Sequence, residues 1–449
     1  MTLSSLWGAE FSVEDSRPKT KKIINKIQKP KELIVTNEKI LKSKSFSIED
    51  KLKAIEDEVH RVLSRYNRST RVIYTIEDFS RYIDRAIENG IISIDTETNN
   101  TLDSLNCKIM GLCLYTPGED SAYIPINHID RVTNTRLSSQ LTESDIKQQL
   151  DRLFSTKIIM HNSKFDCKVI WSTCGCKLKV YWDTQPGARI LNENESAALK
   201  NQYISKIDST QEKYDIEHLF KNIEYAILPP ELFALYAATD SYITYKLYEY
   251  QYKEFNKPEN SRIFKLFKDV EMPVIEVFTS MEINGISLDV DYAKRLSNKY
   301  HNKLDEVSNK LIEELNRLDP VIKSWKNSEK AHERSIDSKG KISKKEKIEQ
   351  LEDPIALTSP TQLSILLYDI LGAKVVDKSS PRGTGEDILE VLKKDFPICS
   401  LLLEQRSILK MLDAFIDTLP NQLSPRDGKI HSNFNPLGAD TGRVSCTQP

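Results

Sequence analysis

Strand-like apolar runs alternate with apolar residues at helical spacing along the middle of the chain. A short β-branched run at residues 91–94 leads into Asp-Thr-Glu-Thr, and two further strand-like runs follow at 108–115 and 121–126. A fourth run at 157–160 passes directly into apolar residues at helical spacing. This alternation predicts an α/β domain over residues 72–255.

Helical patterns dominate the rest of the chain. One long helix is predicted after the Pro229-Pro230 pair, and a heptad-like apolar seam runs through residues 290–318. Residues 324–349 are mostly Lys, Glu and Ser, which indicates a polar tip, and residues 359–419 carry a second helical block. We therefore expect a mainly helical region, with a helical hairpin, over residues 256–425.

The composition excludes two classes of protein. Among 449 residues, 64 Lys and Arg stand against 66 Asp and Glu, so the chain is not a globally basic nucleic-acid coat, and a polyanion must be held locally. No apolar run approaches the roughly 18 residues that span a bilayer, so we expect no membrane association. Seven scattered cysteines, an odd number, and the lack of an apolar leader favour reduced thiols in a cytoplasm.

The N-terminal segment differs from the rest of the chain. Residues 16–31 contain seven basic residues and no acidic one. We therefore expect residues 1–71 to form a basic, flexible arm.

Carboxylates recur at the ends of predicted elements. Asp95 and Glu97 end the first strand two residues apart, so both project from one face of it. Asp166 follows the 157–160 strand, and Tyr236 and Asp240 lie at i and i+4 on one face of the long helix. These residue types predict a site for two cations that catalyses phosphoryl transfer.

The chemistry explains why carboxylates are needed. Phosphodiester hydrolysis requires a deprotonated water, a neutralised non-bridging oxygen and a stabilised leaving oxyanion, and two divalent ions roughly 3.5–4 Å apart supply all three. Mg²⁺ and Mn²⁺ prefer oxygen ligands. A tyrosine hydroxyl near such ions can orient the attacking water.

The strings IDTET, HNSKFD and YAATDSYITY resemble the three motifs of the DEDD superfamily of 3′–5′ exonucleases, in the subgroup with Tyr four residues before the last Asp. The resemblance implies a ribonuclease H-like fold, with a mixed central sheet flanked by helices. It implies that Asp95, Glu97 and Asp240 hold the inner metal ion and that Asp95 also touches the outer one. Asp166 would bind the outer ion through water, and Tyr236 would position the nucleophile.

The same resemblance implies contacts to the terminal nucleotide from Thr98, Leu102 and Asn162. The chain has Asn-Asn-Thr before Leu102, where the family has a shorter spacer. His128 and Asp183 also match family positions, but a structural histidine and a helix cap are the expected roles.

The second half resembles the thumb and the first palm segment of family A DNA polymerases, bacterial and phage. The resemblance rests on EMPVIEVFTSMEINGISLD, LTSPTQLSILLYDILGAK, EQRSILKMLDAFIDTLP and KIHSNFNPLGADTGRVSCTQP. It implies a thumb at 256–425, the start of a palm at 426–449, and Arg443 reaching the minor groove of a primer–template duplex. The expected substrates are a single-stranded 3′ end of DNA and that duplex.

The later polymerase motifs of the family are absent from the printed sequence. We therefore expect a proofreading exonuclease part that acts in DNA replication but does not polymerise alone. A partial reading frame, a second polypeptide that carries the rest of palm and fingers, and a stand-alone exonuclease are three explanations. Variant motif spellings look closer to phage enzymes, which would place the protein in a host cytoplasm. Two alternative functions are a non-catalytic DNA- or partner-binding fragment and a ribonuclease D-like RNA exonuclease.

Overall fold

The computed structural model describes residues 40, 45–63, 69–99, 103–209, 223–332, 347–439 and 441–447. Within these ranges, no helix is both long enough and apolar enough to cross a membrane. The basic stretch at 16–31 and most of the expected polar tip lie outside the described residues.

The α/β region is built on one six-stranded sheet in the order β1-β4-β3-β2-β5-β6. The strands β2, β3 and β4 form an antiparallel meander, whereas β1 is parallel to β4 and β5 and β6 continue parallel to β2. The predicted mixed sheet is therefore confirmed. The strands are β1 (Thr70–Val72), β2 (Ile91–Thr98), β3 (Ile109–Tyr115), β4 (Ser121–Pro125), β5 (Lys157–Met160) and β6 (Val180–Asp183).

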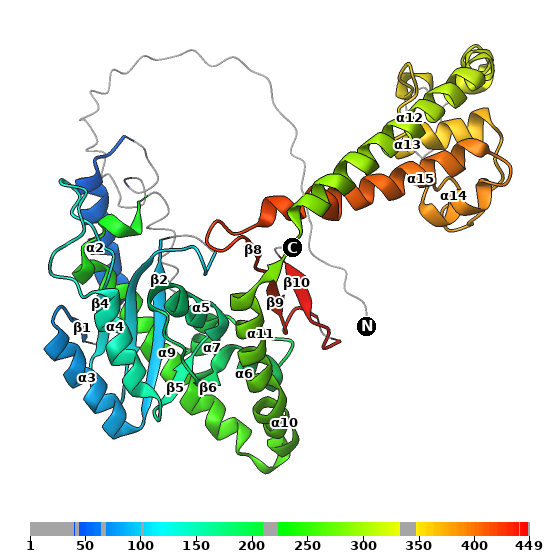
Figure 1. Ribbon diagram of the computed structural model, residues 1–449. Helices are drawn as coiled ribbons and strands as arrows, with labels where there is room; N and C mark the ends of the chain where they lie inside the picture. Colours follow the sequence, from blue (N-terminus) through cyan, green and yellow to red (C-terminus); the bar gives the residue numbers. More distant parts are fainter. Residues whose placement is uncertain are drawn as a thin grey trace, which may run out of the picture. The chain divides into compact units, whose positions relative to one another are not determined.

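Helices cover both faces of the sheet (Figure 1). On one face, α3, α4 and α5 bury an apolar core that includes Ile92 and Ile94 of β2. On the other face, the long helix α9 packs across β1 to β5, and α6 and α7 pack against α9. The helices are α3 (Ile76–Asn89), α4 (Glu143–Leu150), α5 (Ser163–Cys174), α6 (Thr184–Leu191), α7 (Leu199–Lys206) and α9 (Pro230–Phe255).

Local sequence explains how α3 turns into β2. Thr75 caps the first turn of α3 by accepting from the amide of Asp78, and Gly90 ends the helix at φ 66°. A left-handed residue costs glycine little, so the chain reverses there and enters the sheet.

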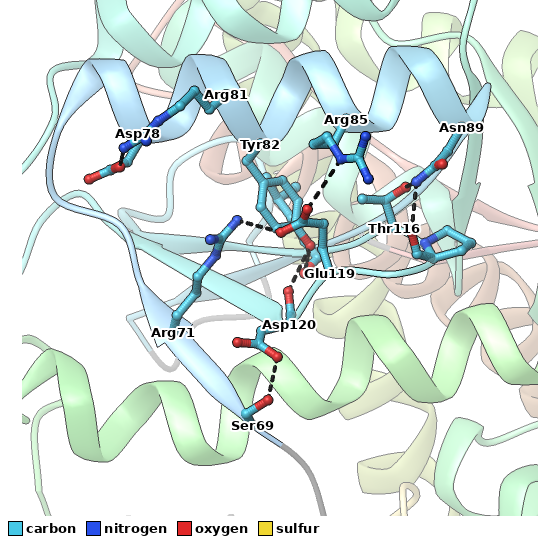
Figure 2. A network of polar contacts seen from close by, with 12 residues as sticks. Ser69, Arg71, Asp78, Arg81, Tyr82, Arg85, Asn89, Thr116, Glu119 and Asp120 are labelled. Atoms are coloured by element: carbon cyan, nitrogen blue, oxygen red, sulfur yellow. Dashed lines mark hydrogen bonds and ion pairs between the residues drawn. The ribbon is translucent and has the colours of Figure 1, made fainter.

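Ion pairs and hydrogen bonds tie the turn between β3 and β4 to α3 and β1, as Figure 2 shows. Glu119 in the turn accepts from Arg71 of β1 at 3.0 Å and from Arg85 of α3 at 3.4 Å. The buried Tyr82 donates to the backbone oxygens of Leu114 and Asp120 at 3.1 and 3.0 Å. These contacts hold the edge strand β1, which begins at Thr70, inside the stretch 1–71 that was expected to be a flexible arm.

An aromatic cluster extends the core beyond β6. Trp182 packs against Phe255 and Phe267, with ring centroids 5.6 and 4.6 Å away. Its indole nitrogen donates to Gln251 of α9 at 2.9 Å. This cluster anchors α10 (Ser261–Leu266) and the π-helical turn η5 (Phe267–Glu271) next to the α/β region.

The mainly helical region is confirmed after α9. The helices are α11 (Met272–Asn284), α12 (Val290–Lys326), α13 (Pro360–Ser364), η8 (Ile365–Ile370), α14 (Glu386–Leu392), α15 (Pro397–Met411) and η9 (Leu412–Ile416). Figure 1 shows α12 and α15 side by side, and their apolar faces share one core with α14. The predicted seam at 290–318 lies within α12.

Short strands return the chain to the end of α11. β8 (Lys429–Ile430) pairs with β7 (Ile286–Ser287), and β9 (Asn433–Asn435) pairs with β10 (Ser445–Thr447). The expected palm start at 426–449 thus consists, where described, of strand and turn structure.

The N-terminal part contains one described helix, α2 (Ile48–Leu63), within the expected arm. Ser47 begins it by donating to Asp50 at 2.9 Å and accepting from the Asp50 amide at 3.1 Å. The chain divides into two compact units between Glu58 and Val59, within α2. The arm is therefore helical over residues 48–63.

Candidate active site

Two carboxylates project from β2 toward α9. The side chains of Ile92 and Ile94 point into the apolar core, so by the two-residue period Asp95 and Glu97 point to the opposite face. Across the sheet, Asp95 pairs with Cys113 and Glu97 pairs with Gly111. Ligand atoms of Asp95, Glu97 and Cys113 lie within 4.8 Å of one another.

Gly111 of β3 leaves room for the aromatic ring of Tyr123 from the neighbouring strand β4. A Cβ atom at Gly111 would lie 2.4 Å from the ring of Tyr123, a distance that real side chains do not show. The glycine therefore lets Tyr123 lie over β3 next to the site.

The third carboxylate, Asp166, comes from the first turn of α5. Its Oδ1 accepts from the backbone nitrogen of Thr96 at 3.0 Å and from the Thr96 hydroxyl at 2.6 Å. Because Thr96 lies between Asp95 and Glu97, these bonds fix Asp166 at the end of β2. Asp166 is 4% exposed.

Helix α9 supplies Tyr236 and Asp240, one turn apart on the face toward the sheet. Tyr236 is buried, and Asp240 is close enough to both Asp95 and Cys113 to raise their pKa values. Lys200 of α7 contacts both α9 residues: its Nζ is 3.3 Å from the Tyr236 hydroxyl and 3.3 Å from Asp240 Oδ2. The five predicted catalytic residues are thus brought together from three elements.

Burial and like charge shape the electrostatics of the site. Burial raises the pKa of Asp95 well above its ordinary value, and repulsion from Asp166, Glu97 and Asp240 raises it further, against the opposing charge of Lys200. Burial also raises the pKa of Asp166, although the two bonds from Thr96 oppose the shift. Crowded carboxylates of this kind are stabilised by a proton or by a cation.

The donor set fits a hard divalent cation. Asp95, Glu97, Asp166 and Asp240 offer oxygen atoms, which Mg²⁺ and Mn²⁺ prefer. Cys113 adds a soft donor. Burial and the nearby carboxylates raise the pKa of its thiol well above the ordinary value, so the thiol stays protonated.

Asn162 lies at the junction of β5 and α5 in a left-handed conformation, φ 60° and ψ 46°. Asp183 holds this junction by accepting from the amides of Asn162 and Ser163 at 2.9 and 2.7 Å. Asp183 also caps α6, accepting from the Gln185 amide at 3.0 Å. The expected capping role of Asp183 is therefore observed, and the Asn162 side chain lines a cavity with Lys164.

The three other residues predicted to contact the substrate do not line the cavity beside Asn162 in the described part of the chain. Thr98 ends β2 and is half-buried, at a register shift against β3. Leu102 lies outside the described residues. Arg443 is exposed just before β10 and belongs to the C-terminal segment rather than to the group of carboxylates.

His128 is fully buried and has a structural environment. Its Nδ1 lies 2.9 Å from the backbone oxygen of Leu228, and its Nε2 lies 2.8 Å from the hydroxyl of Tyr123. Because a carbonyl oxygen only accepts, Nδ1 carries the proton and Nε2 accepts from the tyrosine. The ring thus links β4 to the start of α9.

Sequence reasoning missed two residues of the site. Cys113 reaches it through the pairing of β3 with β2, and Lys200 reaches it through the packing of α7 on α9. The residue opposite Asp95 could be identified only after the pairing register of β2 with β3 was known. The sequence of α7, LKNQYISK, carried no signal that we could identify.

Two family models match the chain. Residues 70–255 match a model described as 3′-5′ exonuclease, and residues 326–449 match a model described as DNA polymerase family A. Residues 326–449 are thus similar to DNA polymerase family A. The first model covers the whole sheet and α9, so this α/β region is a 3′–5′ exonuclease domain, and domains of this type use divalent metals.

Curated relatives match the chain over most of its length. The chain is 26% identical to DNA polymerase I of Chloroflexus aurantiacus over 373 residues, which is 80% of this chain and 34% of the relative. It is 25% identical to DNA polymerase I of Borreliella burgdorferi over 385 residues, covering 85% of this chain and 37% of the relative. The chain thus spans about a third of the length of these relatives.

A solved structure of the family shares the fold. The POL domain of Pol1 from M. smegmatis, in complex with DNA primer-template and dNTP, superimposes with a TM-score of 0.60 at 18% identity. The match covers 85% of this chain and 55% of that chain. The expected exonuclease domain, with a mixed central sheet flanked by helices and followed by a helical region, is confirmed.

Proposed function

We propose that this chain is a metal-dependent 3′–5′ exodeoxyribonuclease that removes 3′-terminal nucleotides from single-stranded or frayed DNA as a proofreading activity. The observation that carries the proposal is the convergence of Asp95, Glu97, Asp166 and Asp240, with Tyr236, from β2, α5 and α9. The match to the exonuclease model over residues 70–255 and the similarity to DNA polymerase family A over residues 326–449 support it.

In this proposal, Asp95, Glu97 and Asp240 hold one divalent ion, and Asp95 and Asp166 hold a second, Mg²⁺ or Mn²⁺. Bound ions of this kind supply an activated water and neutralise the charge that develops on the phosphate. The protein positions the ligands: β2 fixes two carboxylates, and Thr96 fixes the third through its bonds to Asp166.

Tyr236 would orient the attacking water by a hydrogen bond from its hydroxyl. Thr98, Leu102 and Asn162 would contact the terminal nucleotide, and Arg443 would contact duplex DNA. The M. smegmatis relative, solved with DNA primer-template, supports duplex DNA as the partner of the helical region.

The test is degradation of a 5′-labelled primer with a mismatched 3′ end, with Mg²⁺ and with EDTA. Asp95→Ala and Asp240→Ala are expected to abolish nearly all hydrolysis, by at least about 10³-fold, because each removes an ion ligand. Glu77→Ala, an exposed carboxylate of α3, is the matched control and should retain full activity. Near wild-type trimming by Asp95→Ala would contradict the metal assignment.

Two further comparisons separate the alternatives. Equal or faster trimming of an RNA strand of the same sequence would favour the ribonuclease D-like alternative, and DNA binding without hydrolysis would favour a binding fragment. The same reaction with added nucleotides tests polymerisation. Trimming without primer extension is expected, because the rest of the palm and the fingers would have to come from a second polypeptide. The cytoplasmic location and the phage-like origin stay predictions.

A further inference from the structure

Lys200 is held among the proposed catalytic groups by three contacts. Its Nζ is 3.3 Å from the hydroxyl oxygen of Tyr236 and 3.3 Å from Asp240 Oδ2. The same nitrogen lies 4.6 Å from the centroid of the Tyr236 ring. The Lys200 side chain is 15% exposed, so a long, flexible residue is confined between α7 and α9.

The chemistry of an ammonium group fixes the direction of these contacts. Lysine has three N–H donors and no acceptor, so the Tyr236 oxygen must accept in this hydrogen bond. The hydroxyl proton of Tyr236 must then point in another direction. A second N–H faces the carboxylate of Asp240, so one cation links two residues that lie one helical turn apart.

We propose that Lys200 is a positioning residue of the exonuclease site, which is itself anchored by Asp240 and sets the direction of the Tyr236 hydroxyl. The inference rests on the proposed function, since the hydroxyl matters for hydrolysis only if it orients the attacking water. With one lone pair of its oxygen engaged by Lys200, Tyr236 donates its proton to the water oxygen. The two hydrogens of that water then point away from Tyr236, toward a carboxylate that can accept one of them.

A second possibility is that Lys200 only packs α7 onto α9. The two roles differ in what a loss of Lys200 does after Tyr236 has lost its hydroxyl. If Lys200 acts through that hydroxyl, its removal costs little in a Tyr236→Phe background. If Lys200 only packs the helices, the loss is the same in both backgrounds.

The experiment measures kcat and KM of the full chain on 5′-labelled single-stranded DNA with Mg²⁺. The variants are Lys200→Met, which keeps most of the side-chain length, Lys200→Arg, which keeps the charge, and each combined with Tyr236→Phe. Lys206→Met is the control on the same helix, since Lys206 pairs with Glu195 at 2.7 Å instead.

Lys200→Met is expected to lower kcat about 10²-fold with little change in KM, as expected for a misplaced catalytic group. Lys200→Arg should recover most of this loss, and Lys206→Met should behave as wild type. In the Tyr236→Phe background, Lys200→Met should cost less than about threefold. An equal loss in both backgrounds would overturn the proposal.

Mn²⁺ binding followed by electron paramagnetic resonance gives a readout apart from activity. Lys200→Met should bind Mn²⁺ at least as tightly as the wild type, because a positive charge beside Asp240 has been removed. Weaker binding would mean that the carboxylates had moved, which would contradict a role exerted through Tyr236. If Lys200→Met proves unfolded by circular dichroism, Lys200→Ala with and without Tyr236→Phe makes the same comparison.

The outcomes separate the two proposals. An inactive wild-type chain would overturn the proposed function and this inference with it. An active wild type with an equally active Lys200→Met variant would overturn only the inference.

Discussion

Glu282 of α11 lies buried against Lys168 of α5, with Oε2 2.5 Å from the ammonium nitrogen. The same carboxylate pairs with Lys164 and accepts from the backbone nitrogen of Phe434 at 2.7 Å. Lys164 also donates to Asn433 at 2.9 Å. One carboxylate therefore joins the helix that carries Asp166 to α11 and to β9.

We predict that Glu282→Ala loosens this junction more than any nearby exposed substitution. The substitution leaves Lys164 and Lys168 buried without their counter-ion. Removing one partner of a buried ion pair lowers the free energy of unfolding by about 3–5 kcal/mol. Glu282→Gln should cost less, because its amide oxygen still accepts from Lys164 and from Phe434. The measurement is hydrogen exchange in α5 and α11.

The control for this prediction is Glu276→Ala, an exposed carboxylate on the same helix. It should leave exchange in α5 unchanged. Unchanged exchange in Glu282→Ala would show that the pair does not stabilise the junction.

We predict acid sensitivity from His128. Burial lowers its pKa to about 4, whereas the unfolded chain has a value of about 6.5. The folded state therefore favours the neutral ring, and this contribution to stability is complete above pH 6.5 and is lost as the pH falls toward 4. The full loss is about 3 kcal/mol.

The measurement is the free energy of unfolding of the exonuclease domain in the full chain between pH 7.5 and 4.5. His128→Gln should be less stable at neutral pH but lose less stability on acidification. His60→Gln, an exposed histidine of α2, is the control and should follow the wild type. Parallel curves for His128→Gln and the wild type would exclude His128 as the source.

A third prediction concerns Thr96, whose hydroxyl donates to Asp166 at 2.6 Å. Thr96→Val keeps the shape of the side chain but removes a hydrogen bond to a charged group, which contributes about 1.5–3 kcal/mol. Since this bond opposes the raised pKa of Asp166, its loss should raise that pKa further and lower exonuclease activity.

The pH profile of activity tests this assignment. The acidic limb of the Thr96→Val profile should move to higher pH, because Asp166 must lose its proton to bind a cation. Thr75→Val, which alters only the cap of α3, is the control and should leave the limb in place. A uniform loss of activity at all pH values would point to displacement of Asp166 instead.

Some of the site followed from the sequence because its geometry is local. The two-residue period of β2 put Asp95 and Glu97 on one face, and the helical period of α9 put Tyr236 near Asp240. The strands β1 and β6 were missed. Thr-Arg-Val of β1 is too short and too polar to show a pattern, and Val-Tyr-Trp-Asp of β6 lacks the Ile-Ile pair that marked the equally short β5. Cys113 and Lys200 were missed because pairing register and helix packing, not local spacing, bring them to the carboxylates.

A final prediction separates the backbone role of Asn162 from its proposed contact with DNA. At φ 60°, Asn162→Ala is expected to lose about 1 kcal/mol of stability, because the left-handed region is less favourable for alanine than for asparagine. Asn162→Gly accepts the same backbone angle and should stay close to wild-type stability. If the amide contacts the terminal nucleotide, both variants should raise KM on single-stranded DNA by a similar factor, whereas a purely conformational role would leave the KM of Asn162→Gly unchanged. Thermal unfolding and steady-state kinetics on the same two variants therefore distinguish the roles, since only the alanine variant is strained and both lack the amide.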